Sequence, residues 1–349
     1  GIRRPPPSLL ASTKCECGSR MSIILSAPKP NQRPLTDAEQ TSHDVEDATY
    51  IGVTWQKYAQ VWKQEDGKLF RPEVPHFTVL PIAAQGSVAA TLLKKCHPNA
   101  TLHRMALDPG QYYPRIARPH DQHPTDMPTP QNGAWPEDDE TFDAARHFST
   151  LVDELDDILK TVEPVAENFG AYGNRIRNLL ILACTECENQ MRAVLSENGL
   201  AGGRPTKDRY TTKHFVKLQN PMRLGEYGVS FAEMPWLGIM RPFQLWVELA
   251  TTKTIDWYDR YNASKHNRSA NISKANLISV FQALSALWIL LTAQYGPNGW
   301  RIRAGSERVF ECVEAPRWRY SDVYTFPYKG TDERVEAVKL FSSTQERSL

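Results

Sequence analysis

The sequence has almost no excess of charge of either sign, because 41 lysines and arginines balance 40 aspartates and glutamates to a formal net charge of +1. A nearly neutral chain excludes a general attraction to nucleic acids or membranes, so binding to a polyanion needs a local group of cations. Charge is uneven along the chain: residues 137–167 are mainly acidic and residues 204–223 mainly basic. Taken alone, each run is typical of a solvated surface.

Cysteine is also scarce, with six residues in 349 and no regular spacing, which excludes the disulfide framework of a small secreted domain. Cys184 and Cys187 lie in an apolar helical pattern, and no second Cys or His pair follows at zinc-finger spacing, so we expect them to be buried. His120 and His123 have no third ligand at a matching spacing. The sequence therefore predicts neither a metal site nor a cofactor.

Long hydrophobic runs are limited to one segment, residues 277–295, which is long enough to cross a bilayer and lies in a stretch without charged residues. Polar side chains interrupt or flank this run: Asn276, Ser279, Gln282, Ser285, Thr292 and Gln294. A central helix surrounded by other helices has the same composition. We therefore expect a cytoplasmic protein without a membrane partner.

The first 144 residues contain few patterns with a helical period. We expect a leader and flexible arm over residues 1–48, a small α+β region over 49–112, and a proline-rich linker over 113–144.

Helical patterns dominate the rest of the chain. Apolar residues recur at i, i+3 and i+4 over residues 148–162 and 176–194. A third helix begins near Thr254, a candidate cap, and a fourth ends at Gly296-Pro297. These patterns predict a mainly α fold, an antiparallel four-helix bundle with short β pieces in an insertion and in the C-terminal tail. The predicted ranges are 145–330 for the bundle, 200–242 for the insertion and 331–349 for the tail.

The densest group of polar side chains lies in the third predicted helix, within residues 257–268. Asn262 and His266 are four positions apart and share a face, whereas Arg260 is rotated from His266 by about 120°. Arginine is a forked donor suited to phosphate, and histidine can give or take a proton, so the pair suits metal-independent cleavage of RNA. The alternative is that these side chains tie the helix to its neighbours.

The Arg-x5-His run from Arg260 to His266 resembles the Arg-x4-6-His motif of HEPN domains, helical bundles of prokaryotic toxins and of abortive-infection and CRISPR-linked ribonucleases. The pattern Tyr-Asn-x-x-Lys-His-x-Arg, residues 261–268, is also similar to a signature of uncharacterised bacterial proteins. The resemblance covers roughly residues 145–328. One departure concerns the small polar residue that follows the arginine in the family, because Tyr261 holds that position here.

The resemblance implies a homodimer in which two copies of the motif build one composite site. Arg260 would grip the scissile phosphate, His266 would transfer protons, and Asn262, one place later than in the family, would orient the histidine. The RNA backbone would be held by cations of the same helix and of the basic insertion: Lys265, Arg268, Lys213 and Lys217.

Two hypotheses follow from the residues and the resemblance. The first is an endoribonuclease of a toxin–antitoxin or antiviral defence system, with an antitoxin or another defence protein as partner. The second is a non-catalytic module that binds a nucleotide, RNA or a protein. An accessible Arg260 and His266 that converge on a groove favour the first hypothesis, whereas an internally paired cluster favours the second.

Overall fold

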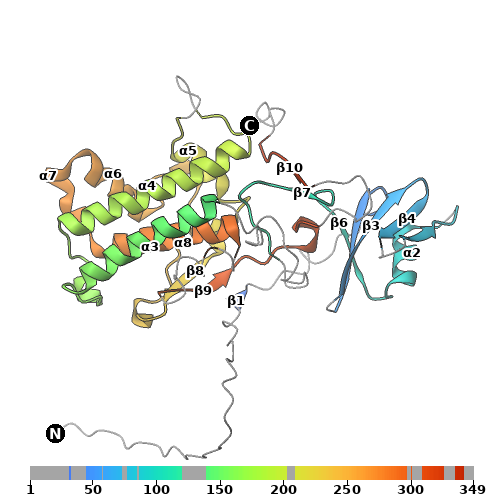
Figure 1. Ribbon diagram of the computed structural model, residues 1–349, viewed down its shortest axis with the longest axis horizontal. Coiled ribbons are helices and arrows are strands. Elements are labelled where there is room, and N and C mark those ends of the chain that lie inside the picture. Colours follow the sequence, from blue (N-terminus) through green and yellow to red (C-terminus); the bar gives the residue numbers. More distant parts are fainter. Residues whose placement is uncertain are drawn as a thin grey trace, which may run out of the picture.

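The computed structural model describes residues 31–32, 45–56, 58–72, 77–84, 86–119, 139–202, 209–296, 300, 309–325 and 335–341. Two lobes lie along its long axis, a helical lobe and a smaller lobe built on a sheet (Figure 1). Most of the predicted leader and arm, the histidine pair at 120 and 123, and most of the predicted linker lie outside the described residues.

The smaller lobe is a five-stranded antiparallel sheet with the order β5-β4-β3-β2-β6. Its strands are β2 (Tyr50–Trp55), β3 (Tyr58–Glu65), β4 (Lys68–Pro72), β5 (Phe77–Pro81) and β6 (Thr101–Arg104). Asp66 and Gly67 both have positive φ, as the tight turn between β3 and β4 requires. Helix α2 (Val88–Lys95) packs Leu92 onto Ile51 and Trp62 in the core of this lobe.

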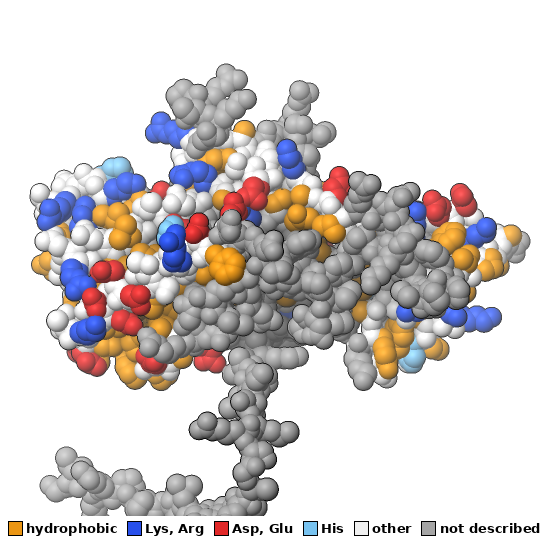
Figure 2. Space-filling model, viewed as in Figure 1, with side chains coloured by type: hydrophobic (Ala, Val, Ile, Leu, Met, Phe, Trp, Pro, Cys, Tyr) orange, Lys and Arg blue, Asp and Glu red, His pale blue; other side chains and the backbone are white. Residues whose placement is uncertain are grey.

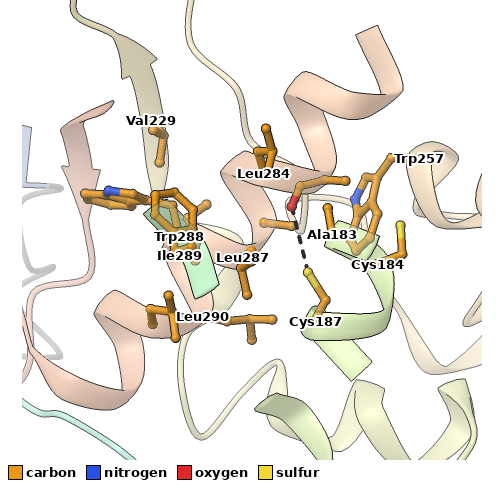
Figure 3. Packing of buried hydrophobic residues seen from close by; sticks show 14 of the residues in the cluster. Ala183, Cys184, Cys187, Val229, Trp257, Leu284, Leu287, Trp288, Ile289 and Leu290 are labelled. Atoms are coloured by element: carbon orange, nitrogen blue, oxygen red, sulfur yellow. Dashed lines mark hydrogen bonds between the residues drawn. The ribbon is translucent and has the colours of Figure 1, made fainter. Parts of the chain in front are cut away.

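The helical lobe is arranged around α8 (Leu277–Tyr295), which contacts three other helices, α3, α4 and α6. The other α-helices are α3 (Asp139–Leu159), α4 (Asn174–Glu197), α5 (Thr212–Phe215), α6 (Asp256–His266) and α7 (Arg268–Asn271). Cys184 and Cys187 of α4 are buried beside Trp257 and Leu284, and the Cys187 thiol lies 3.8 Å from the Ala283 carbonyl (Figure 3). The prediction that the C-x-x-C pair is buried is thus confirmed.

Among the described residues, α8 is the one helix that is long and apolar enough to cross a membrane. Of its most apolar 18-residue window, 89% is buried inside the protein. This is the burial of a core helix, consistent with a soluble protein.

A second, three-stranded sheet closes one side of the helical lobe, in the order β1-β9-β8. Its strands are β1 (Asn31–Gln32), β9 (Phe310–Ala315) and β8 (Gly228–Phe231). Phe231 packs its ring against Phe281 of α8 and against Phe310. Strand β8 therefore finds its partner about 80 residues away along the chain, and this pairing has no local sequence signal.

The two lobes meet along the segment that follows β9. Trp318, Tyr320 and Val323 form a cluster with Val61 and Met105 of the sheet lobe. A side chain on Gly52 of β2 would lie 2.7 Å from the Tyr320 ring, so only glycine lets that ring rest on the strand. A short parallel pair, β7 (Gln111–Tyr112) with β10 (Glu336–Ala337), lies nearby.

Short 3-10 helices connect these elements, and they lie mostly in the predicted insertion and around α6. They are η1 (Ala166–Asn168), η2 (Val216–Leu218), η3 (Leu224–Glu226), η4 (Pro235–Leu237), η5 (Glu248–Ala250), η6 (Ile272–Lys274) and η8 (Tyr320–Asp322).

The predicted mainly α fold is wrong. Among the residues that the structure describes there are seven α-helices, 46% of the residues are helical when the 3-10 helices are included, and 18% lie in strands, including the five-stranded sheet, so the fold is of the α+β class. A four-helix bundle is not clearly shown. The third predicted helix, α6, has 11 residues and spans only about 16 Å, whereas α4 has 24 residues and spans about 36 Å. The β8–β9 pair packs on α8 through the ring of Phe231, which contacts Phe281.

Candidate nucleic-acid interface

Helix α6 carries most of the predicted site and is shorter than the sequence indicates. It begins at Asp256 without a side-chain cap, because Ile255 holds the cap position, and the Thr254 hydroxyl donates to the Ala250 carbonyl. It ends at His266, and the Asn267 side chain accepts from the Ala270 N–H to cap α7. The chain therefore turns between His266 and Arg268, where the prediction had a continuous helix.

One face of α6 is an aromatic anchor for the lobe. Trp257, Tyr258 and Tyr261 are buried against α4 and α8. The Trp257 indole N–H donates to the Pro242 carbonyl at 3.1 Å, and the Tyr258 hydroxyl donates to Glu188 at 2.6 Å. Burial and this carboxylate raise the pKa of Tyr258 well above its ordinary value. These rings pack the core and are not open to stacked bases.

The structure does not bring Arg260 and His266 together within one chain. The Arg260 guanidinium donates to Asp256 at 2.6 Å, one turn toward the start of the helix, and is 33% exposed. His266 is exposed in the last turn, about 9 Å further along the axis by helix rise alone. Among the described residues, no hydrogen bond joins the half-buried Asn262 to His266. A composite site built by two chains stays a prediction.

Two predicted RNA-binding cations, Lys265 and Arg268, donate hydrogen bonds to neutral groups, although the Glu188 carboxylate also acts on Lys265. The Lys265 ammonium donates to the Tyr261 hydroxyl at 2.7 Å and lies 4.9 Å from the centre of that ring. This hydrogen bond raises the pKa of Lys265. Arg268 donates to the side-chain oxygen of Asn174 at 2.7 Å. In contrast, Asp256 offsets the charge of Arg260.

The other two predicted RNA-binding cations, Lys213 and Lys217, lie elsewhere. They are on α5 and η2, and the Thr212 hydroxyl bonds at 3.1 Å to those of Thr251 and Thr252, which precede α6. They are therefore near the opposite end of α6 from Arg268. Part of the basic insertion, residues 203–208, lies outside the described residues.

The N-terminus of α4 meets the C-terminus of α6, because the two helices run antiparallel. Arg177 donates to the Ser264 carbonyl at 3.2 and 3.4 Å, while Arg268 reaches Asn174. The first turn of α4 has no acidic residue, and its cap, Gly173, has no side chain to satisfy the N–H groups there. Such a helix start favours anions.

An exposed aromatic ring and a further lysine adjoin this helix start. Tyr172 is 56% exposed and forms an isolated bridge with Asn276, and the exposed Lys274 lies two residues before Asn276. Blue side chains gather at the end of the helical lobe that carries α6 and α7 (Figure 2). We define the α4–α6 corner as the following residues: Tyr172, Asn174, His266, Arg268 and Lys274.

Tyr172 and Asn174 were not predicted from the sequence, although a signal was present. Tyr172 lies between two glycines, Gly170 and Gly173, in a short link between two helical patterns. An aromatic residue in such a link is more often exposed than one within a helical stripe.

Metal ligands are not grouped anywhere in the part of the chain that the structure describes, where no three His, Cys, Asp or Glu side chains could hold an ion. Comparisons of the chain with protein-family models, curated protein sequences and solved structures found no match. The resemblance to HEPN domains stays a prediction.

Proposed function

We propose that this cytoplasmic protein binds single-stranded RNA through the α4–α6 corner, as a non-catalytic module. One observation carries the proposal: Arg268 has no ion pair among the described residues and is held by Asn174 at the start of a long helix whose first turn has no acidic residue. Phosphate groups are favoured both by such a cation and by free N–H groups at a helix start.

The corner also has an exposed aromatic ring on which a nucleotide base can stack. Tyr172 exposes an aromatic ring beside the cations, and stacking of a base on such a ring contributes about 1–3 kcal/mol. Arg268 donates to Asn174, two residues after Tyr172, and Lys274 lies two residues before Asn276, the bridge partner of Tyr172, so both cations would contact phosphates near this ring. Stacking with backbone contacts is the usual mode for single strands and has little sequence preference.

The pairing within α6 favours binding over cleavage. Asp256 neutralises Arg260 and draws its guanidinium away from His266, so one chain lacks a convergent charge and proton donor. The pairing of Arg260 agrees with the second hypothesis, whereas His266 is exposed.

Fluorescence anisotropy with a labelled mixed-sequence RNA 12-mer tests the proposal. Arg268→Gln with Lys274→Gln is expected to weaken binding by about tenfold or more at 100 mM salt, because two phosphate contacts are lost. The matched control is Arg146→Gln, an arginine of α3 that is 72% exposed and paired with Asp143, which should bind as the wild type does. Equal affinities for the double variant and the control would overturn the proposal.

A cleavage assay on the same RNA in EDTA separates the two hypotheses. The wild type, His266→Ala and Arg260→Ala are expected to leave the RNA intact at equal levels. Cleavage by the wild type that both variants abolish, with their folding unchanged, would instead establish the ribonuclease with a composite site.

A further inference from the structure

A cavity of about 510 Å³ lies near the junction of the two lobes, because Trp318 both lines it and packs against the sheet lobe. Three separate segments line it: Arg118 before α3, the loop from Gln219 to Glu226, and the segment from Trp318 to Asp322 after β9. Its volume suits a ligand of metabolite size. None of these residues is part of the predicted RNA site.

The wall of the cavity is a stack of guanidinium and indole groups. The guanidinium carbon of Arg118 lies 5.0 Å from the centre of the Trp318 ring, and that of Arg223 lies 5.5 Å from it. Arg118 also lies 4.9 Å from the Tyr113 ring and donates to the Asp322 carbonyl at 2.9 Å. These contacts fix the donors of Arg118 before any ligand is present.

Three residues that line the cavity each have a buried polar atom without a hydrogen-bond partner among the described residues. They are the indole nitrogen of Trp318, the Nε of Arg118 and the side-chain oxygen of Gln219. Trp318 is only 4% exposed, so water does not readily satisfy its N–H. Buried polar groups are normally paired, so these three atoms have hydrogen-bonding capacity that no group among the described residues uses.

The charges around the cavity are unevenly compensated. Glu226 accepts two hydrogen bonds from Arg223, each 2.7 Å, and so offsets its charge. Arg118 meets only a neutral carbonyl, and the exposed Arg319 has no ion pair within the described part of the chain. The Asp322 carboxylate also lines the cavity and accepts from Ser321 at 3.4 Å. Two cations therefore face one carboxylate, an excess of positive charge.

We propose that this cavity binds a small phosphate monoester. Arg118, Arg319 and Trp318 all line the cavity and would donate to the terminal oxygens of a phosphate, whose double charge two guanidinium groups would balance. The Gln219 oxygen accepts from a hydroxyl or amino group on the rest of the ligand. A carboxylate would leave one donor unpaired, since it carries a single charge and two oxygens.

Isothermal titration calorimetry with adenosine monophosphate, inorganic phosphate and succinate tests this site. The wild type is expected to bind the monophosphate and phosphate at one site per chain. Arg319→Gln and Trp318→Phe should each weaken the binding of the monophosphate by about tenfold, the usual effect of losing one hydrogen bond to a charged group. Trp318→Phe keeps the ring and removes only the N–H, and Arg319 is exposed, so both variants should stay folded.

The corner variant Arg268→Gln supplies the matched control, because it should leave the monophosphate affinity unchanged. Three results would overturn the proposal: no saturable binding of either phosphate probe, equal affinities for Arg319→Gln and the wild type, or tighter binding of succinate than of phosphate. Loss of affinity in Arg268→Gln alone would assign the phosphate to the α4–α6 corner.

Discussion

The α4–α6 corner and the cavity between the lobes both concentrate arginine, but they hold it differently. At the corner, Arg268 is exposed and bonds to one neutral amide oxygen. At the cavity, Arg118 lies against the rings of Tyr113, Trp318 and Tyr324. An exposed cation suits the repeated charges of a polymer, whereas an arginine oriented by rings suits one small ligand in one position.

The largest expected effect is a loss of stability on removal of the Trp318 ring, which lines the cavity. Trp318→Ala should lower the free energy of unfolding by about 3–5 kcal/mol, because it removes a buried indole at the junction of the lobes. Urea unfolding followed by circular dichroism measures the change. Trp236→Ala is the control, since that indole is 61% exposed, and its loss should cost less than about 1 kcal/mol. Equal losses would show that the junction does not depend on Trp318.

A second effect concerns acid stability at the junction. Burial lowers the pKa of His103, which lies 5.4 Å from the Tyr320 ring and 2.8 Å from the Thr54 hydroxyl, to about 4. Because the unfolded state binds the proton more tightly, this stability is complete above about pH 6.5 and is lost as the pH falls toward 4. The loss amounts to at most about 3 kcal/mol.

Urea unfolding at pH 7.5 and at pH 5 measures this dependence. His103→Gln should flatten it between the two pH values, whereas His266→Gln, which changes an exposed imidazole of the corner, should leave it as in the wild type. A dependence that survives His103→Gln would place its origin in other groups.

A smaller effect, on the salt dependence of RNA binding, distinguishes Arg268 from Arg260. Arg268→Gln should reduce the slope of log affinity for RNA against log salt by about 0.7, the value of one phosphate contact with a single strand. Arg260→Gln should change the slope less, because Asp256 already offsets that charge. Anisotropy titrations at four salt concentrations give both slopes. A larger change for Arg260→Gln would mean that its ion pair opens on RNA.

The smallest effect is on the hydrogen bond that holds Lys265. Tyr261→Phe should cost about 1 kcal/mol in the free energy of unfolding and should return the pKa of Lys265 toward its ordinary value. NMR titration of the lysine and urea unfolding report the two changes. Tyr172→Phe, at an exposed ring, should alter neither, and an unchanged Lys265 pKa in Tyr261→Phe would contradict the assigned cause.

Sequence patterns located the long helices well, because their periodicity lies within each helix. The predicted range 176–194 lies inside α4, and the predicted end of the fourth helix at Gly296 is the observed one. The range 148–162 missed the acidic first turns of α3, where charged residues mask the period. An α+β region was expected over residues 49–112, but the number and order of its strands were not, because the strands are short and their partners are set by pairing rather than by local pattern.

The candidate sites were harder to predict, for a related reason. The density of cations in α6 did indicate the region of the corner. However, Asn174 and Arg268 are 94 positions apart, and Arg118 and Trp318 are 200 positions apart, so no spacing rule links them. Whether the charge of an arginine is offset by a carboxylate or faces the solvent depends on such distant partners.

The Tyr320 ring resting on Gly52 determines how this protein can be divided. The segment that follows β9 continues from the helical lobe in sequence but covers the sheet lobe in space. A fragment starting at residue 145 would leave Trp318, Tyr320 and Val323 bare, and a fragment ending at 119 would uncover Val61 and Met105. Assigning activities to either half therefore calls for point substitutions in the intact chain, since truncation would produce aggregation-prone, partly unfolded fragments.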